Sequence, residues 1–265
     1  TGIDNTAVGA YAGTNLSTGQ ENVALGKSAL HDCTDGDKNV AVGLNALFAV
    51  TTGNYNVAVG ANAGDSITTG VRNTVCGNGS LAALTTGQDN TAMGSGALTA
   101  NTADNNTAVG SNCLAANTTG AECVAVGHDV MEASNATGNT GVGFQAMKVL
   151  STGTYNTAVG HNAAFAITTG ITNTALGVNG LYAITTGDNN TAVGCDSGQS
   201  VTTGDNNTFL GHDAGRTASP SGNVTTGSNN FVLGDNSVAN LYCADTSISS
   251  SDARDKTDVE DFKYG

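Results

Sequence analysis

Three histidines are the first residues in the sequence with the chemistry to bind a metal ion. His128, His161 and His212 occupy the same place in a 17-residue repeat, two and three copies apart. If the copies stack at the spacing of neighbouring β-strands, these side chains are about 10 and about 14 Å apart. Zinc–nitrogen bonds are only about 2.0–2.1 Å long, so the histidines are too far apart to share an ion within one chain. We therefore predict surface histidines, no metal site and no cofactor.

The cysteines and the acidic turns offer two further candidate sites. The six cysteines contain no C-x-x-C pair, which argues against a metal framework and against a dense disulfide framework. Cys76 replaces Val or Leu of other copies and Cys123 replaces Asn, so both are predicted to be small buried substitutes. Three Asp-Asn pairs lack the spacing of calcium-binding β-rolls and are interpreted as Asx turns: Asp104-Asn105, Asp188-Asn189 and Asp205-Asn206.

Sugar chemistry requires either paired carboxylates or exposed aromatic rings. Glycoside hydrolysis needs two carboxylates about 5 to 10 Å apart in a cleft. The carboxylates here lie mostly in turns, and no copy introduces an aromatic-rich cleft, so a capsule depolymerase is the least favoured function and we predict no enzyme. Aromatic rings at Phe48, Phe165 and Tyr182 either stack on sugars or fill the edge of the fold, and we favour the second role.

All of these residues are positioned by one repeat. The pentapeptide N-[T/V]-A-[V/L]-G recurs fourteen times, at intervals of 17 residues except for two of 16 and a last one of 23. We number each copy from its asparagine, so that this glycine is position five. Thr-Thr-Gly and the β-branched residues favour two strands of about five residues and two turns. The predicted fold is all-β, a parallel β-solenoid or β-roll of about fourteen 17-residue coils.

Side-chain alternation along the first strand gives it two faces. Position four is apolar in every copy and position two is almost always β-branched, so we expect this face to form the core. Positions nine and twelve, such as Leu181 and Ile184, are expected to join it. Position three is Ala in ten copies, and this outward stripe predicts coils packed side by side as a homotrimer. Alternatively, alanine is simply tolerated at the surface.

Two other positions have predicted backbone roles. Asparagine occupies position one in every copy but that of Cys123, and stacked amides predict a hydrogen-bonded ladder. The glycine at position five is expected to have a positive φ or to make room for a tight corner. Shortened turns are expected near Ala103-Asp104 and Ala136-Thr137, and the insertion within 216–223 should form a loop that protrudes, as a spacer or cap.

Charge and hydropathy exclude two classes of partner. With 8 basic and 22 acidic residues, the net charge is −14, which leaves no cationic surface for nucleic acid. No run approaches the roughly 20 apolar residues that span a bilayer, so no membrane insertion is expected. The start, Thr1 to Asp4, lacks a basic-then-apolar leader, and we expect a piece of a longer or processed protein.

The end of the chain contains a family signature. The segment Ser251-Asp-Ala-Arg-Asp-Lys256, followed by Thr-Asp-Val, resembles the opening of the endosialidase-type intramolecular chaperone found at the C-terminus of phage tail fibres and tailspikes. The resemblance implies a trimerising, self-cleaving domain in which Ser251 and Lys256 are the catalytic residues. It divides the chain into a fibre (1–238), a connector (239–251) and the start of a truncated chaperone (252–265).

The repeat body is similar to the heads of YadA-like trimeric autotransporter adhesins, whose N-S-V-A-I-G units form trimeric β-rolls. Both resemblances imply a homotrimer. The leading hypothesis is a structural tail-fibre segment of a phage or phage-like particle, located in the virion tail, contacting other tail proteins and binding a host-surface glycan or protein receptor. The alternative is a trimeric adhesin or matrix fibre on a bacterial cell surface.

Overall fold

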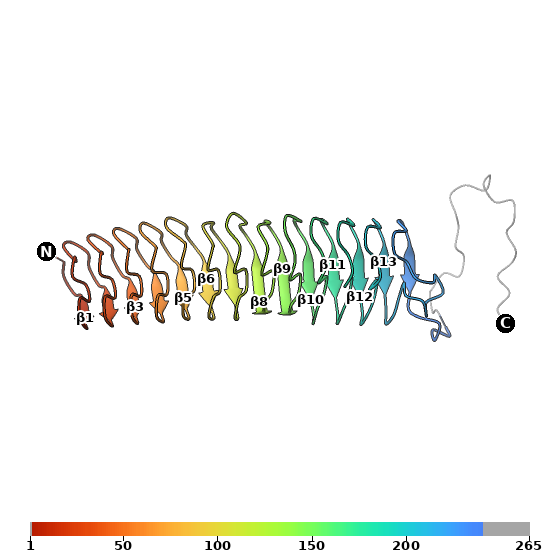
Figure 1. Ribbon diagram of the computed structural model, residues 1–265, viewed down its shortest axis with the longest axis horizontal. Coiled ribbons are helices and arrows are strands. Elements are labelled where there is room, and N and C mark those ends of the chain that lie inside the picture. The colour runs from red at the N-terminus through yellow and green to blue at the C-terminus, as the bar shows by residue number, and fades with distance from the viewer. Residues whose placement is uncertain (1, 241–265) are drawn as a thin grey trace, which may run out of the picture.

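The protein is a straight rod of stacked coils in the computed structural model, which describes residues 2–240 (Figure 1). Fourteen strands form one parallel sheet in chain order, and each residue pairs with its equivalent in the next repeat, as Val40 does with Val57. The strands are β1 (Thr6–Val8), β2 (Val23–Leu25), β3 (Val40–Val42), β4 (Val57–Val59), β5 (Thr74–Cys76), β6 (Thr91–Met93), β7 (Thr107–Val109), β8 (Val124–His128), β9 (Thr140–Phe144), β10 (Thr157–Val159), β11 (Thr174–Leu176), β12 (Thr191–Val193), β13 (Thr208–Leu210) and β14 (Phe231–Leu233). The predicted solenoid of fourteen coils is confirmed.

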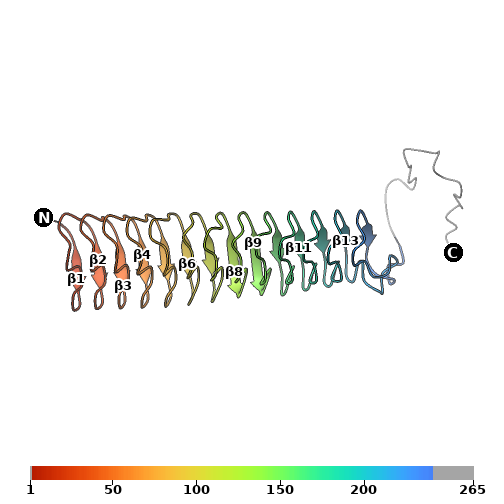
Figure 2. The ribbon, with the colours of Figure 1, turned by 45° about the horizontal axis from the view of Figure 1, so that its top comes forward.

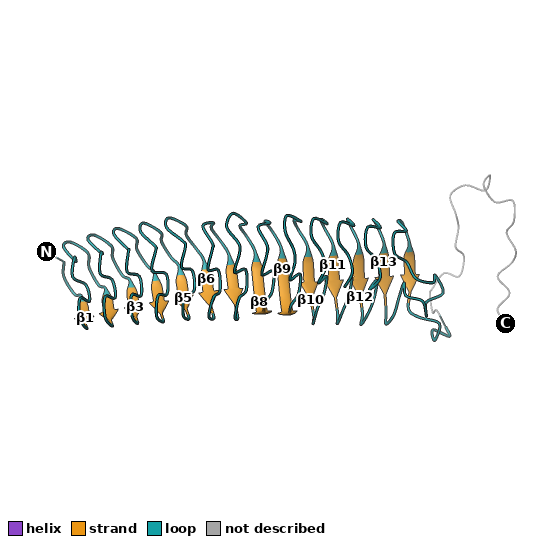
Figure 3. Ribbon diagram, in the orientation of Figure 1, coloured by secondary structure: helices purple, strands orange, loops and turns teal. Residues whose placement is uncertain are grey.

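Each coil contains one strand, so the prediction of two strands per coil is wrong. The strands form a single row along the rod, and turns make up the rest of every coil (Figures 2 and 3). Positions seven and nine have left-handed backbones, for example Asn45 with φ 54° and Leu47 with φ 48°, and such residues interrupt a strand. Their amides still bond between coils, because the Leu47 N–H donates to the Ala63 carbonyl at 3.0 Å. The side of each coil that contains positions seven to nine is therefore hydrogen-bonded to its neighbours but is not a β-sheet.

The strands face the opposite way to the prediction. The position-three residue is fully or almost fully buried in β2 to β14, and Ala92 is 0% exposed. The larger side chains at positions two and four point outward, and Met93 beside it is 43% exposed. Cys76, at position four, is exposed, so its predicted burial is wrong, whereas that of Cys123 is confirmed. Alanine therefore lines the inside of each coil and not a contact between chains.

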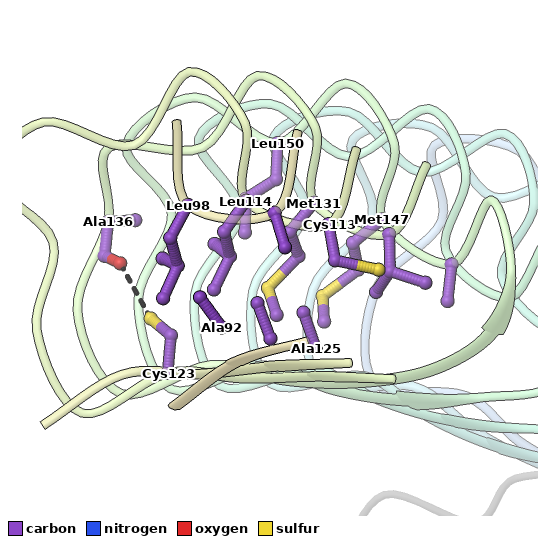
Figure 4. Packing of buried hydrophobic residues seen from close by; sticks show 14 of the residues in the cluster. Ala92, Leu98, Cys113, Leu114, Cys123, Ala125, Met131, Ala136, Met147 and Leu150 are labelled. Carbon is purple, nitrogen blue, oxygen red and sulfur yellow. Dashed lines mark hydrogen bonds between the residues drawn. The ribbon is translucent and has the colours of Figure 1, made fainter. Parts of the chain in front are cut away.

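The narrow interior explains why alanine is inside. Position three faces the position-nine side chains of its own coil and the preceding coil, which are buried as predicted, as are those at position twelve. Position three also shrinks where a neighbouring interior residue is larger than usual: Val130 occupies position eight, where most coils have Ala, and a Cβ on Gly141 would lie only 2.6 Å from its Cγ1. The terminal carbons of Met131 and Met147 would lie at an ordinary contact distance of 3.4 Å. Figure 4 shows both methionines among the buried side chains. The interior keeps nearly constant volume, as close packing requires.

Phe209 is the converse case. It is the largest fully buried side chain and occupies position three of its coil. The position-nine residues next to it are Gly198 and Gly215, and a Cβ on Gly215 would lie 2.4 Å from the Phe209 ring. Phe209 therefore fits because both neighbouring position-nine residues are glycine.

The predicted asparagine ladder is present and also closes each coil. Asn39 donates its backbone N–H and its Nδ2 to Asn22 Oδ1, at 2.8 and 3.1 Å, and donates Nδ2 to the Gly53 carbonyl of its own coil at 2.8 Å. The ladder is interrupted at Cys123, whose Sγ lies 3.0 Å from the Ala136 carbonyl instead (Figure 4). Each asparagine thus makes two hydrogen bonds to the preceding coil and a third within its own coil.

The glycine at position five serves both predicted purposes. Gly43 has a φ of 137°, and a Cβ there would lie 2.4 Å from the Gly60 carbonyl oxygen of the next coil. No residue with a side chain fits at this corner without separating the coils.

The irregular coils have hydrogen bonds that the regular coils lack. In the first shortened coil Asn101 replaces an apolar residue, donates to Asn90 Oδ1 at 3.3 Å and accepts from Asn106 Nδ2 at 3.2 Å. The insertion after β13 is a loop, as predicted, but its middle is attached to the last coil: the Asn236 N–H donates to the Ala218 carbonyl at 2.7 Å. None of the described residues forms an apolar helix long enough to cross a bilayer.

Candidate functional site

The outward side of the sheet is the largest candidate site. We call it the strand face, made of the residues at positions two and four of all fourteen coils. Position two is Thr, Val or Phe, and position four is Val, Leu, Met or Cys. None is buried in the described part of the chain; the most exposed apolar member is Phe231 at 67%, whereas others, such as Val42 and Leu210, are only partly exposed. The strand face therefore has no charged residue: position four is a continuous apolar column, and position two beside it is Thr in nine coils and Val or Phe in five.

The size of the strand face exceeds that of an ordinary surface patch. Fourteen strands at about 4.8 Å spacing make it about 65 Å long, and three residues make it about 10 Å wide. Its flat area, threonines included, is on the order of 650 Å², slightly above the roughly 300–600 Å² of the largest apolar patch on a typical monomer. Two such faces in contact would bury about 1,300 Å², which is within the standard range for a specific protein–protein interface.

The charged residues lie outside this face, and some of them are paired within the chain. Arg72 Nε contacts Asp89 Oδ1 at 2.7 Å, and Lys148 Nζ contacts Asp129 Oδ2 at 2.9 Å. The lysine hydrogen bond lowers the pKa of Asp129 below its usual range. Two copies of this acidic chain can therefore approach through the strand face without bringing like charges into contact.

The sequence-predicted catalytic residues, Ser251 and Lys256, lie outside the described residues. The predicted surface histidines are confirmed: His128, His161 and His212 are all exposed. His128 and His161 do not meet, because Phe144 stacks between them with ring centroids 5.6 and 5.2 Å away. They form an exposed aromatic stack at the edge of the strand face.

A shallow hollow of about 390 Å³ lies between the third and fourth coils. Phe48, Asn45 and Asp65 line it together with Ala49 and Ser66. His31 stacks on Phe48 with ring centroids 4.9 Å apart, and the next coil has Asp65 at the equivalent position instead of another ring. Burial raises the pKa of the Asp65 carboxyl above its usual range. One aromatic ring beside amide, hydroxyl and carboxyl groups is a suitable contact for a sugar.

Sequence reasoning did not identify this hollow, although the repeat contains the signal. Phe48 and Asp65 are both at position ten of consecutive coils, so an aromatic followed one repeat later by a short acid leaves a gap in the stack. The other aromatic pair, Phe165 and Tyr182, stacks at 5.3 Å with only 9° between ring planes. Both are half-buried and fill the edge of the rod, as predicted.

The Asp-Asn pairs connect neighbouring coils. Asp188 Oδ1 accepts from the Ile171 N–H, and Asp205 Oδ1 accepts from the Asp188 N–H, both at 2.8 Å. The Asx-turn interpretation is therefore wrong for these pairs, because the carboxylates bond to the preceding coil and not within their own turn.

Three of the cysteines have no exposed thiol. Burial raises the pKa of Cys33, Cys113 and Cys123, so their thiols are protonated at neutral pH. All three pack as small core residues.

Comparison with known protein families, with characterised proteins and with solved structures gave no match to this chain.

Proposed function

We propose that this chain is a structural segment of a homotrimeric fibre, in which three rods bury their strand faces against one another around a common axis. The observation that carries this proposal is the outward side of the sheet, which has no charged residue and has an uninterrupted apolar column at position four along its whole length. Water-exposed apolar area on this scale is costly, at about 25 cal/mol per Å², and burial between copies removes the cost. The Thr and Val side chains are stiff, so little side-chain entropy is lost on association.

Three chains are favoured over two by the resemblances of the repeat and of the C-terminal signature, both to trimeric fibres. A phage tail fibre, or the fibre of a phage-like particle, is the full-length protein that accounts for both resemblances. In it the rod supplies rigid reach, and residues from Ser251 onward begin the self-cleaving chaperone.

Assembly is tested with the 265-residue chain by sedimentation equilibrium and circular dichroism. The wild-type chain is expected to sediment as a trimer. Replacing Val57 and Val59 together by Lys places charges on the strand face and is expected to give monomers that keep the β-spectrum, because neither side chain supports the coil interior. Thr69→Lys, on an exposed turn, is the matched control and is expected to remain trimeric. A stable wild-type monomer or dimer contradicts the proposal.

Receptor binding is the second part of the proposal. We place a host-surface glycan contact at the hollow beside Phe48, where a sugar ring can stack on the aromatic face while Asn45 and Asp65 bond its hydroxyls. Each contact is weak, and three copies on one fibre multiply it by avidity. Phe48→Ala is expected to reduce binding to host surface polysaccharide, whereas Phe165→Ala, in the edge-filling stack, is the control. Equal binding by both variants contradicts this placement.

A bacterial trimeric adhesin or matrix fibre is the second candidate, because the repeat resembles adhesin heads, whereas only the C-terminal segment resembles a tail fibre. The flanking gene sequence separates the two. A tail-attachment domain upstream and the rest of the chaperone downstream support the fibre of a particle, whereas a membrane anchor or coiled-coil stalk supports the adhesin.

A further inference from the structure

His212 lies among carboxylates at the C-terminal end of the rod. Its Nδ1 is 3.5 Å from Asp213 Oδ2 and 3.6 Å from Asp235 Oδ2, and the three side chains have ligand atoms within 4.8 Å of one another. His212 and Asp213 follow β13, and Asp235 follows β14, so they come from two coils separated by the 23-residue interval. Within residues 2–240, no other place combines a histidine with two carboxylates in this way.

These distances match the spacing of ligands around one metal ion. Zinc binds imidazole nitrogen and carboxylate oxygen at about 2.0–2.2 Å, and in a tetrahedron this places neighbouring ligand atoms about 3.4 Å apart. The two observed histidine–carboxylate distances exceed this by only a few tenths of an ångström, which small side-chain rotations provide.

The carboxylates are already oriented towards the histidine. Arg216 Nη1 donates to Asp213 Oδ1, and the Ser237 N–H donates to Asp235 Oδ1 at 2.9 Å. Each acid therefore has one oxygen held by a neighbour and the other, Oδ2, directed at His212. Outer hydrogen bonds of this kind fix the ligands of natural metal sites.

A second triple, Cys195, Asp196 and His212, fits an ion less well. Asp196 Oδ1 already accepts from Asn179 Nδ2 at 2.9 Å and from Gln199 Nε2 at 2.8 Å. Its Oδ2 faces Arg216 Nη1 at 3.3 Å. Both oxygens of Asp196 are thus engaged, whereas Oδ2 of Asp213 and Oδ2 of Asp235 each contact His212 Nδ1.

The local charge also favours a divalent cation. Asp196, Asp213 and Asp235 contribute three negative charges, and Arg216 balances one of them. With His212 neutral, as a ligand must be, two negative charges remain at the end of the rod. A divalent ion neutralises both.

We propose that His212 Nδ1, Asp213 Oδ2 and Asp235 Oδ2 bind one divalent transition-metal ion of the zinc class per chain, with water completing the coordination. The ion joins the thirteenth coil to the fourteenth across the insertion. It therefore fastens the last coil of the rod, which has a neighbouring coil on one side only within the described residues. The site is contained in one chain and is independent of the assembly and receptor proposed above.

Isothermal titration with zinc chloride tests the site in the 265-residue chain after removal of any affinity tag. One ion per chain is expected, and His212→Ala and Asp235→Asn are each expected to weaken binding at least tenfold. His161→Ala is the matched control, since His161 occupies the same position of its coil but lies beside Phe144, and it is expected to bind as the wild type does. Wild-type affinity in His212→Ala, or no zinc binding by the wild-type chain, overturns the proposal.

The absorption spectrum of bound cobalt identifies the ligands, and amide hydrogen exchange measures how far the ion stabilises the last coil. Cobalt is expected to show ligand-field bands without a thiolate charge-transfer band, and Cys195→Ser is expected to leave the spectrum unchanged. A thiolate band that Cys195→Ser removes overturns the proposal by moving the site to Cys195. Zinc is expected to slow amide exchange in 224–238 of the wild type and not of His212→Ala. Equal slowing in both overturns the assigned ligands.

Discussion

Asn39 donates two hydrogen bonds to the side-chain oxygen of Asn22, one from its backbone N–H at 2.8 Å and one from Nδ2 at 3.1 Å. Both residues are buried, and the same relationship continues along the ladder to Asn90 and again from Asn139 to Asn230. Each amide is therefore satisfied only when its neighbouring coils are in register. The ladder makes coil stacking a condition for burying these polar groups.

Asn56→Ala is expected to destabilise the rod by about 2–4 kcal/mol, because two buried groups lose their partners. Asn73 loses the acceptor of its backbone N–H, and the Gly70 carbonyl loses the Asn56 Nδ2 donor. Urea unfolding followed by circular dichroism measures the effect. Asn78→Ala, which removes only an exposed 3.4 Å bond, is the control. Equal stability of the two variants would show that the ladder contributes nothing.

Ala92→Leu tests which side of the strand is inside. Ala92 faces the position-nine residues Leu81 and Leu98, all of them 0% exposed, so extra carbons overfill the interior. A loss of about 1–3 kcal/mol is expected from overpacking. Met93→Leu, one residue along on the strand face, is expected to be nearly neutral. A harmless Ala92→Leu would mean that the alanines are not enclosed.

Phe209 and Gly198 are expected to show strong coupling in a double-mutant cycle. Phe209→Ala leaves a cavity and costs about 3–5 kcal/mol. Gly198→Leu clashes with the ring, since a Cβ at Gly198 would lie 2.7 Å from Phe209 Cδ2. The double variant restores the common pairing of alanine at position three with leucine at position nine, so its loss should be much smaller than the sum of the two single losses. Thermal unfolding of the four proteins measures the coupling, and additive losses would contradict the volume rule.

Asp65 is expected to make stability fall as pH rises through the acid range. Burial raises its folded-state pKa above the ordinary 3.8, so the folded chain holds the proton more tightly than the unfolded chain. The stabilising effect of protonation is present below 3.8 and is lost as pH rises through the higher folded-state value. Unfolding midpoints between about pH 3 and 6 are expected to decline more in the wild type than in Asp65→Asn. Parallel profiles would contradict the shift.

The candidate sites were only partly predictable from the residue pattern. The exposure of His212 followed from its position in the coil, but the carboxylates around it did not, because Asp235 is adjacent only after the insertion has folded back. The Phe48 hollow likewise depends on a short acid following an aromatic ring one coil later. Such contacts arise between coils and require a defined stacking register.

The repeat period by itself determined the coil length, the parallel stacking, the asparagine ladder and the burial of positions nine and twelve, because a strict period places equivalent residues over one another. Only the tertiary structure decided which face of the strand is inside. Alternation separates position three from positions two and four without saying which face is enclosed, and apolarity favoured the wrong one. A coil of this length encloses so little volume that alanine is found between two leucines, as Ala92 is between Leu81 and Leu98, whereas Val75, also beside Leu81, has Gly64 on its other side. The larger residues are therefore outside, where they form the strand face.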